Sequence, residues 1–143
     1  MLCVRTMRAV IAAGWGGLTQ GNLPDTVFAV DAVPRDWLLP KMAAATHHGG
    51  RGTTGAALHA GIPQIVAPFV ADQFFWAQQI EKRGHGPRGI PHTKLTADTL
   101  RKAIGIALND QTIRKRAADI GAQVRAEKGI ARAADTIERA VAK

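Results

Sequence analysis

The sequence predicts an α/β fold in which helices flank a parallel β-sheet. Short apolar runs alternate with segments of helical spacing through the first hundred residues, as in chains of strand–helix–strand units. One run, Gln64–Phe69, is apolar at nearly every position, as a strand buried on both faces requires. A 3.6-residue apolar spacing then continues to the C-terminus. The 143 residues fit a single domain, or part of one, with a core of ordinary size.

Four strands are expected, in the order of the apolar runs. Arg8–Ala13 is ended by a glycine-rich loop, and Val27–Val30 follows a polar turn. A proline divides the stretch Trp37–Ala45, which should therefore form a short helical turn and then a brief strand that ends at Thr46. The run Gln64–Phe69 is the fourth strand.

Two helices are expected between and after the last strands. Thr53–Ala60 should end at Gly61, because glycine readily takes the left-handed conformation that closes a helix. Asp72–Arg83 should begin with Asp72 as its N-terminal cap and end before Gly84.

Helices are also expected throughout the C-terminal part, behind the cap candidate Thr96 and on both sides of a break at Gly129. Three sets of apolar residues at helical spacing indicate them: Leu100, Ala103, Ile104, Ala107 and Leu108; Ile113, Ala117, Ile120 and Val124; Ile130, Ala134, Ile137 and Val141.

The composition excludes several classes of protein. Hydrophobic residues make up 46% of the chain and charged residues 21%, which argues against disorder, and no apolar run is long enough to span a bilayer. The net charge is +8, but much of the basic excess lies in Arg101–Lys143 among acidic residues and without aromatic residues that could stack on a base. We interpret it as solvated helix faces and expect no nucleic-acid partner. Cys3 is the single cysteine, so we expect no internal disulfide and a cytoplasmic location.

The segment Ala43–Ala60 carries the first candidate site. A predicted strand runs into His47-His48-Gly49-Gly50-Arg51-Gly52, and a helix that opens with Thr53-Thr54 follows. Glycines let the backbone approach a ligand, and the N–H groups at a helix N-terminus attract anions. The threonine hydroxyls and a histidine at the strand end add donors. The pattern indicates a phosphate or diphosphate site. The alternative is a helix cap with a glycine turn and two solvated histidines.

The spacing fits neither the dinucleotide-binding nor the P-loop glycine motif, because no third glycine stands at the required offset and no Gly-Lys-Thr occurs. A metal site is not expected either, since the adjacent residues His47 and His48 should point to opposite faces of a strand.

Asp72 and Gln73 form the second candidate site. They follow the next predicted strand, so they should lie at the same edge of the sheet as the histidine and glycine turn, one helix along. A carboxylate accepts hydrogen bonds and an amide both accepts and donates, so the pair suits a polyhydroxylated group such as a sugar. The alternative, which is compatible with that role, is that Asp72 caps the following helix.

The string HHGGRGTTGAALHAGIPQIVAPFVADQFFWAQQIEKRGHGP resembles the donor-binding signature of nucleotide-sugar-dependent glycosyltransferases with two Rossmann-like domains, the GT-B type of the UDP-glycosyltransferase superfamily. The resemblance is to glycopeptide-antibiotic glycosyltransferases and sterol glucosyltransferases. It extends upstream through AVPRDWLLPKMAAATHHGG and RAVIAAGWGGL and downstream to TADTLRKAIGIAL, about Arg8 to Leu108. It implies a Rossmann-like parallel sheet flanked by helices, the incomplete C-terminal half of a GT-B fold.

The resemblance also implies a role for each matching position. His47 contacts the donor diphosphate, backbone amides of the following turn wrap the phosphates, Asp72 and Gln73 bind sugar hydroxyls, and Trp15 lies near the donor cleft. The phosphate turn consists of Gly49, Gly50, Arg51, Gly52 and Thr53. The stretch that borders the nucleobase consists of Val33 and Pro34. Two positions depart from the family pattern: Arg51 stands where a small residue is common, and Arg35 stands where histidine is frequent.

By this resemblance, residues 1–143 form a single, partial nucleotide-sugar-binding domain, which begins about one strand and one helix inside the donor domain and is expected to lack the acceptor domain. No residue matches the catalytic base, which the acceptor domain supplies; the five histidines are His47, His48, His59, His85 and His92. The implied function is transfer of a sugar from a UDP- or TDP-sugar to a lipid, sterol or natural-product hydroxyl with inversion, without a cofactor or metal.

We expect that transfer only together with a separate acceptor-domain polypeptide, and we expect the chain alone to self-associate. Two alternatives stay open. One is a non-catalytic remnant or nucleotide-sugar-binding module, and the other is a Rossmann-like anion-binding domain without preference for a sugar.

Overall fold

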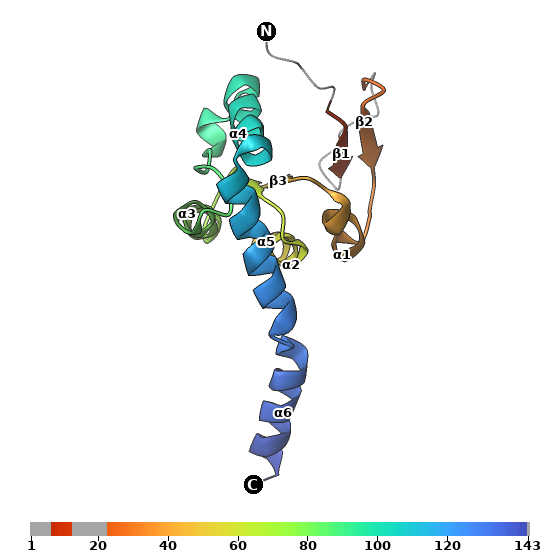
Figure 1. Cartoon of the computed structure of the whole chain (residues 1–143), viewed down its shortest axis with the longest axis vertical. Coiled ribbons are helices and arrows are strands. Elements are labelled where there is room, and N and C mark those ends of the chain that lie inside the picture. Colours follow the sequence, from red (N-terminus) through yellow and green to blue (C-terminus); the bar gives the residue numbers. More distant parts are fainter. Residues whose placement is uncertain (1–6, 13–22, 143) are drawn as a thin grey trace.

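The computed structural model describes residues 7–12 and 23–142 and has an α/β fold (Figure 1). Strand β1 (Ala9–Ala12) pairs in parallel with β2 (Val27–Val30), and β3 (Ala45–His47) pairs in parallel with β4 (Gln64–Val66). Helix α2 (Arg51–Ala60) joins β3 to β4 and makes the crossover that a parallel pair requires. The predicted parallel strands are confirmed, and the four described strands form two pairs.

Strand β4 is buried on both faces, as predicted, but shorter than the predicted run Gln64–Phe69. It ends at Val66, two residues before Pro68, which has no backbone N–H to donate to a neighbouring strand. The segment after the next helix continues the packing along β4, since the Gln64 N–H donates to the carbonyl of His85 at 3.0 Å. β4 is therefore covered along its length.

The helices lie close to their predicted ranges, and short 3₁₀ turns connect some of them. These elements are α1 (Arg35–Leu38), η2 (Leu39–Lys41), α3 (Gln73–Arg83), η3 (His92–Lys94), α4 (Ala97–Asn109), α5 (Gln111–Ala126) and α6 (Gly129–Val141).

Most helix ends follow the sequence signals. Thr96 caps α4 in a reciprocal arrangement, in which its Oγ1 accepts from the Thr99 N–H at 3.2 Å and the Thr99 Oγ1 accepts from the Thr96 N–H at 2.9 Å. Gly61 and Gly84 close α2 and α3 in the left-handed conformation. The predicted break at Gly129 is displaced by one residue, because Lys128 takes the left-handed conformation and Gly129 begins α6.

The core consists of small apolar clusters in which β4 and the helices meet. Helix α2 packs on α5 at close range: a Cβ built on Gly121 would lie 2.5 Å from the Cα of Gly61. This packing holds α2 in place. Its first turn therefore has a fixed position beside the end of β3. The buried clusters are Leu39, Ala57 and Ile62; Ile65, Ala103 and Ala107; Val66, Ala77 and Ile80.

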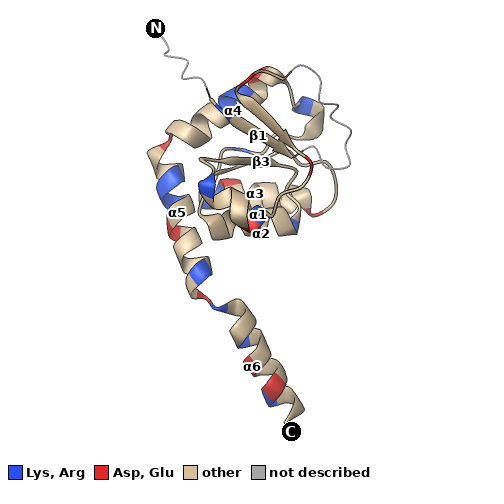
Figure 2. Cartoon of the chain, turned by 90° about the vertical axis from the view of Figure 1, so that its right-hand side faces the viewer, with Lys and Arg blue, Asp and Glu red and all other residues tan. Residues whose placement is uncertain are grey.

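Helix α6 extends away from the rest of the molecule beyond the end of α5 (Figures 1 and 2). It buries no residue, and its apolar side chains Ile130, Ile137 and Val141 are 90%, 65% and 80% exposed. These positions therefore lack cover within the described part of the chain. In the described part of the chain, no helix has both the length and the apolar character needed to cross a membrane.

The basic residues of the C-terminal helices alternate with acidic ones along the surface (Figure 2). Lys102 and Arg101 lie 3.1 and 3.3 Å from the carboxylate of Asp98, and the side chains of all three are mostly exposed. Their charges therefore face solvent, as the sequence predicted, and contribute little to the free energy of folding.

Candidate functional site

The glycine turn and the start of α2 form a cradle of backbone amides. Strand β3 ends at His47, and α2 begins at Arg51 behind Gly50, two residues earlier than the predicted start at Thr53. The N–H groups of Arg51, Gly52 and Thr53 belong to the first turn of α2 and have no partner within the helix, while the next amide already bonds to the carbonyl of Gly50. No acidic residue lies in this turn. The arrangement favours an anion.

Thr54 does not contribute to this cradle as predicted. Its side chain is buried, and its Oγ1 has no hydrogen-bond partner among the described residues. The prediction of a donor from Thr54 is wrong, because the fourth helical position faces the core. Thr53 is only partly buried. Its role as a hydroxyl donor to the ligand stays a prediction.

Gly49 brings the turn into contact with the second candidate site. Its φ is +94°, and an added Cβ would lie 2.8 Å from the Val66 Cγ1 and 3.1 Å from the backbone oxygen of Gln73. No other residue fits this conformation and this space without strain. The expectation that Asp72-Gln73 and the histidine and glycine turn lie at the same edge of the sheet is confirmed.

His47 uses both ring nitrogens within the chain. Its Nδ1 accepts a hydrogen bond from the Gly49 N–H at 3.0 Å, so the ring proton lies on Nε2, which donates to the Gln64 Oε1 at 2.8 Å. Burial lowers the pKa of His47. The hydrogen bond to Gln64 raises it in part, and the electrostatic effect of His48 lowers it further. His47 is therefore neutral at pH 7 and holds the turn. Its contact with the donor diphosphate stays a prediction.

Asp72 and Gln73 lie at the start of α3 with part of their hydrogen-bonding capacity used. The Gln73 Oε1 accepts from the N–H groups of Phe69 and Val70 at 2.8 and 3.2 Å, and thus fixes the loop after β4. Asp72 makes no side-chain cap, and the prediction that it caps α3 is wrong. It takes helical dihedral angles, and its Oδ2 accepts from the Trp76 Nε1 at 3.1 Å.

Asp72 and Gln73 therefore keep complementary groups that can meet a ligand. These are the second carboxylate oxygen of Asp72, an acceptor, and the side-chain amino group of Gln73, a donor. An acceptor and a donor on adjacent residues suit vicinal hydroxyls. The expected role in binding a sugar stays a prediction.

Arg35 reaches the cradle from the first turn of α1. Its Nη1 donates to the Thr53 Oγ1 at 2.9 Å, and the same nitrogen lies 3.9 Å from the position of a Cβ on Gly52. The sequence singled out Arg35 only as a departure from a family pattern. The contact joins residues 18 positions apart, so no local signal predicts it.

The stretch expected at the nucleobase lies beside this contact. Val33 and Pro34 immediately precede α1, and Pro34 is its N-cap residue. Arg35 therefore links that stretch to the phosphate turn. Trp15 lies outside the described residues. Among the residues that the structure describes, no group of three histidine, cysteine or acidic side chains could hold a metal ion.

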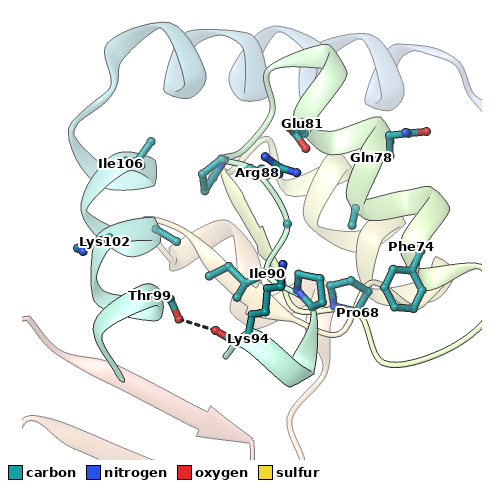
Figure 3. Close-up of a pocket in the computed structure, with 15 residues that line it drawn as sticks. Pro68, Phe74, Gln78, Glu81, Arg88, Ile90, Lys94, Thr99, Lys102 and Ile106 are labelled. Carbon is teal, nitrogen blue, oxygen red and sulfur yellow. Dashed lines mark hydrogen bonds between the residues drawn. The ribbon is translucent and has the colours of Figure 1, made fainter. Parts of the chain in front are cut away.

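An open groove of about 600 Å³ lies apart from these residues (Figure 3). It runs between α3, α4 and the segment that joins them, and none of the predicted site residues lines it. Its walls include Phe74, Ile90 and Ile106, with Arg88 and Lys94 among the basic side chains.

Comparisons with known proteins agree on one family. Residues 9–139 match the family described as erythromycin biosynthesis protein CIII-like, C-terminal domain. A sterol 3-beta-glucosyltransferase of Arabidopsis thaliana is 39% identical over 136 residues, which cover 92% of this chain and 22% of that protein. A sterol 3-beta-glucosyltransferase of Vanderwaltozyma polyspora is 45% identical over 118 residues, 82% of this chain and 9% of that protein. The chain thus spans less than a quarter of these relatives.

Solved structures of glycosyltransferases share the fold. The glycosyltransferase of kitacinnamycin matches with a TM-score of 0.82 and 31% identity, over 92% of this chain and 34% of that one. The glycosyltransferase VinC, solved in complex with dTDP, matches with a TM-score of 0.70 and 32% identity, over 83% of this chain and 31% of that one. The chain therefore belongs to the erythromycin biosynthesis protein CIII-like C-terminal domain family, the C-terminal donor domain of GT-B glycosyltransferases.

Proposed function

We propose that this chain binds a nucleoside diphosphate sugar and serves as the donor half of a glycosyltransferase. The observation that carries the proposal is the amide cradle of Arg51, Gly52 and Thr53, which Gly49 holds against Gln73. A diphosphate bound at the cradle would leave its sugar near Asp72 and Gln73. The VinC structure, solved with dTDP, supports a nucleoside diphosphate as the nucleotide part. We propose TDP or UDP.

The helix N-terminus also suits the chemistry of sugar transfer. When the anomeric carbon–oxygen bond breaks, negative charge develops on the leaving diphosphate, and amides already aimed at it stabilise that charge. Inversion at the anomeric carbon requires the acceptor hydroxyl to attack from the opposite side. A general base must take its proton, and we place that base on an acceptor-binding domain outside residues 1–143.

The acceptor class follows from the relatives. Their names include sterol glucosyltransferases and a glycosyltransferase of kitacinnamycin, so we propose a hydroxyl of a sterol, lipid or other natural product as the acceptor. The described chain alone should therefore bind the donor and transfer nothing. With an acceptor-domain polypeptide it should form a hexosyltransferase.

Calorimetric titration tests the donor site. UDP or TDP should bind more tightly than the nucleoside, and replacement of Asp72 by asparagine or Gln73 by alanine should weaken UDP-glucose by about 1 kcal/mol, the scale of one hydrogen bond. The same variants should bind UDP as the wild type does, because their contacts lie beyond the phosphates. Equal affinity of the wild type for nucleoside and nucleoside diphosphate would contradict the proposal.

A further inference from the structure

The proposed diphosphate site raises the question of which side chain supplies positive charge. A bound nucleoside diphosphate brings two phosphates into a turn whose backbone amides carry only partial charges. The family resemblance implies that His47 contacts the donor diphosphate. In the structure both of its ring nitrogens bond within the chain, to Gln64 and to the Gly49 N–H, so it is neutral and has no proton left to donate.

Arg35 has the position and the chemistry that His47 lacks. Its Nη1 donates to the Thr53 Oγ1 at 2.9 Å, on the first turn of α2 whose amides form the cradle. A guanidinium has five N–H groups, so the bond to Thr53 uses one and leaves others for phosphate oxygens in the fork arrangement that guanidinium forms with phosphate.

Among the described residues, no acidic side chain forms an ion pair with Arg35. Its neighbours Asp36 and Asp31 form no ion pair with it, and the ion pairs of the described residues all lie on α4 and α5. Its Nη1 also lies 3.9 Å from the position that a Cβ on Gly52 would take, which places the guanidinium beside the first turn of α2. Thr53 orients the group, while its positive charge remains available to a ligand.

We propose that Arg35 is a phosphate-binding and specificity-determining residue, which makes this site select nucleoside diphosphates over nucleosides and monophosphates. The inference rests on the proposed donor-binding function and adds a residue to that site. The Thr53 side chain then positions Arg35, and the Thr53 backbone N–H donates to the phosphate. His47 is a positioning residue for the turn.

The test measures the affinity of the whole chain for UDP, UMP and uridine by calorimetry. Arg35→Gln should weaken UDP about tenfold, the scale of one charge-assisted hydrogen bond, while uridine binds as before. The UDP affinity of Arg35→Lys should lie between those of the wild type and Arg35→Gln. The lysine ammonium keeps the positive charge but cannot form the two parallel hydrogen bonds of a guanidinium. Arg132→Gln on α6 is the matched control, since it removes the same charge far from the site, and it should leave UDP affinity unchanged.

A double-mutant cycle separates orientation from charge. Thr53→Val keeps the backbone amide and the approximate shape, and should weaken UDP two- to threefold in the wild-type background. In the Arg35→Gln background the same change should have no effect, because the group that Thr53 orients is gone. If Thr53→Val weakened UDP binding through general instability, the loss of affinity would appear in both backgrounds, and the thermal midpoint would fall as well.

The outcomes distinguish this inference from the proposed function. If Arg35→Gln binds UDP as tightly as the wild type, or if Arg132→Gln weakens UDP equally, Arg35 has no specific role and the inference is overturned. If the wild type binds UDP no better than uridine, the diphosphate site itself is overturned, and the role of Arg35 with it.

Discussion

His47 links the end of β3 to the phosphate turn and to β4 through one neutral ring. It accepts from Gly49 and donates to Gln64, and a proton on Nδ1 would remove the first of these bonds. His47 is half-buried, and His85 is the one fully buried histidine of the described residues. Burial lowers the pKa of His85 too, and the charges of Arg83 and Arg116 lower it further. The folded state therefore favours the neutral form of both rings.

This property predicts a loss of stability in mild acid. The ordinary histidine pKa is 6.5, and both folded-state values lie below it, so between pH 6.5 and the folded pKa the unfolded chain binds more protons. The free energy of unfolding should therefore fall as pH drops below 6.5, by at most about 1.4 kcal/mol per histidine and pH unit, and should be insensitive to these groups above it.

Urea unfolding at pH 7.5, 6.5 and 5.5 measures the effect. His85→Gln should reduce the dependence on pH, whereas His59→Gln should not, because the side chain of His59 is exposed. An unfolding free energy that stays constant from pH 7.5 to 5.5 would contradict a lowered pKa of His47 and His85 in the folded state.

Gly49 is the residue whose backbone the site depends on most. Gly49→Ala should destabilise the chain by about 1–3 kcal/mol, since alanine at φ +94° is strained and its Cβ would contact Val66 at 2.8 Å. It should also weaken UDP by moving the turn. Gly55 in the middle of α2 is the control: its Cβ would meet nothing within 4 Å, so Gly55→Ala should stabilise the chain by about 0.5–1 kcal/mol. Equal effects of the two changes on unfolding would contradict this account of Gly49.

Single residues also show where prediction from the sequence stops. The types and order of His47, Gly49, Asp72 and Gln73 were enough to place two clusters at one edge of a sheet, because parallel strands fix that geometry. The bonds from His47 to Gln64 and from Arg35 to Thr53 join residues 17 and 18 positions apart. The first contact depends on how β3 pairs with β4, and the second on how α1 packs against α2. No local pattern encodes either arrangement.

Helices and strands were predictable wherever a local signal ended them. Thr96 capped α4, and Gly61 and Gly84 ended their helices as predicted, since caps and left-handed glycines act within a few residues. Strand β4 was predicted too long, because hydrophobicity continued past the last hydrogen-bonded position. Helix α2 was predicted too short, because Gly50 and Gly52 flank Arg51 and glycine disfavours a helix.

Helix α6 carries an apolar face that the described chain leaves uncovered. We propose that this face drives self-association, because three large apolar side chains on one exposed helix form a patch that water solvates poorly. Polar replacements at Ile130, Ile137 and Val141 should shift the sedimentation profile toward monomer. These replacements should leave the thermal midpoint of the chain unchanged, since α6 buries no residue. Arg132→Gln serves as the control on the same helix, and an unchanged oligomer distribution in the apolar variants would count against the proposal.

At the scale of the whole molecule, the candidate site occupies one edge of the β3–β4 pair. The amide cradle, Arg35, Asp72 and Gln73 come from α1, α2 and α3 and meet where β3 and β4 end. The relatives extend well beyond the region that this chain matches. An acceptor domain that binds only the folded chain should raise its thermal midpoint by mass action, and transfer activity should appear only in its presence.

Amide mapping by NMR tests the central claim, donor binding at the cradle, most directly. Titration of the ¹⁵N-labelled chain with UDP should shift the amide signals of Gly49 to Thr53, and UDP-glucose should add shifts at Asp72 and Gln73. Uridine should affect the cradle far less, because it carries no phosphate. Shifts confined to the groove around Phe74, Ile90 and Ile106, with the Gly49–Thr53 amides unmoved, would contradict the account and place the nucleotide elsewhere.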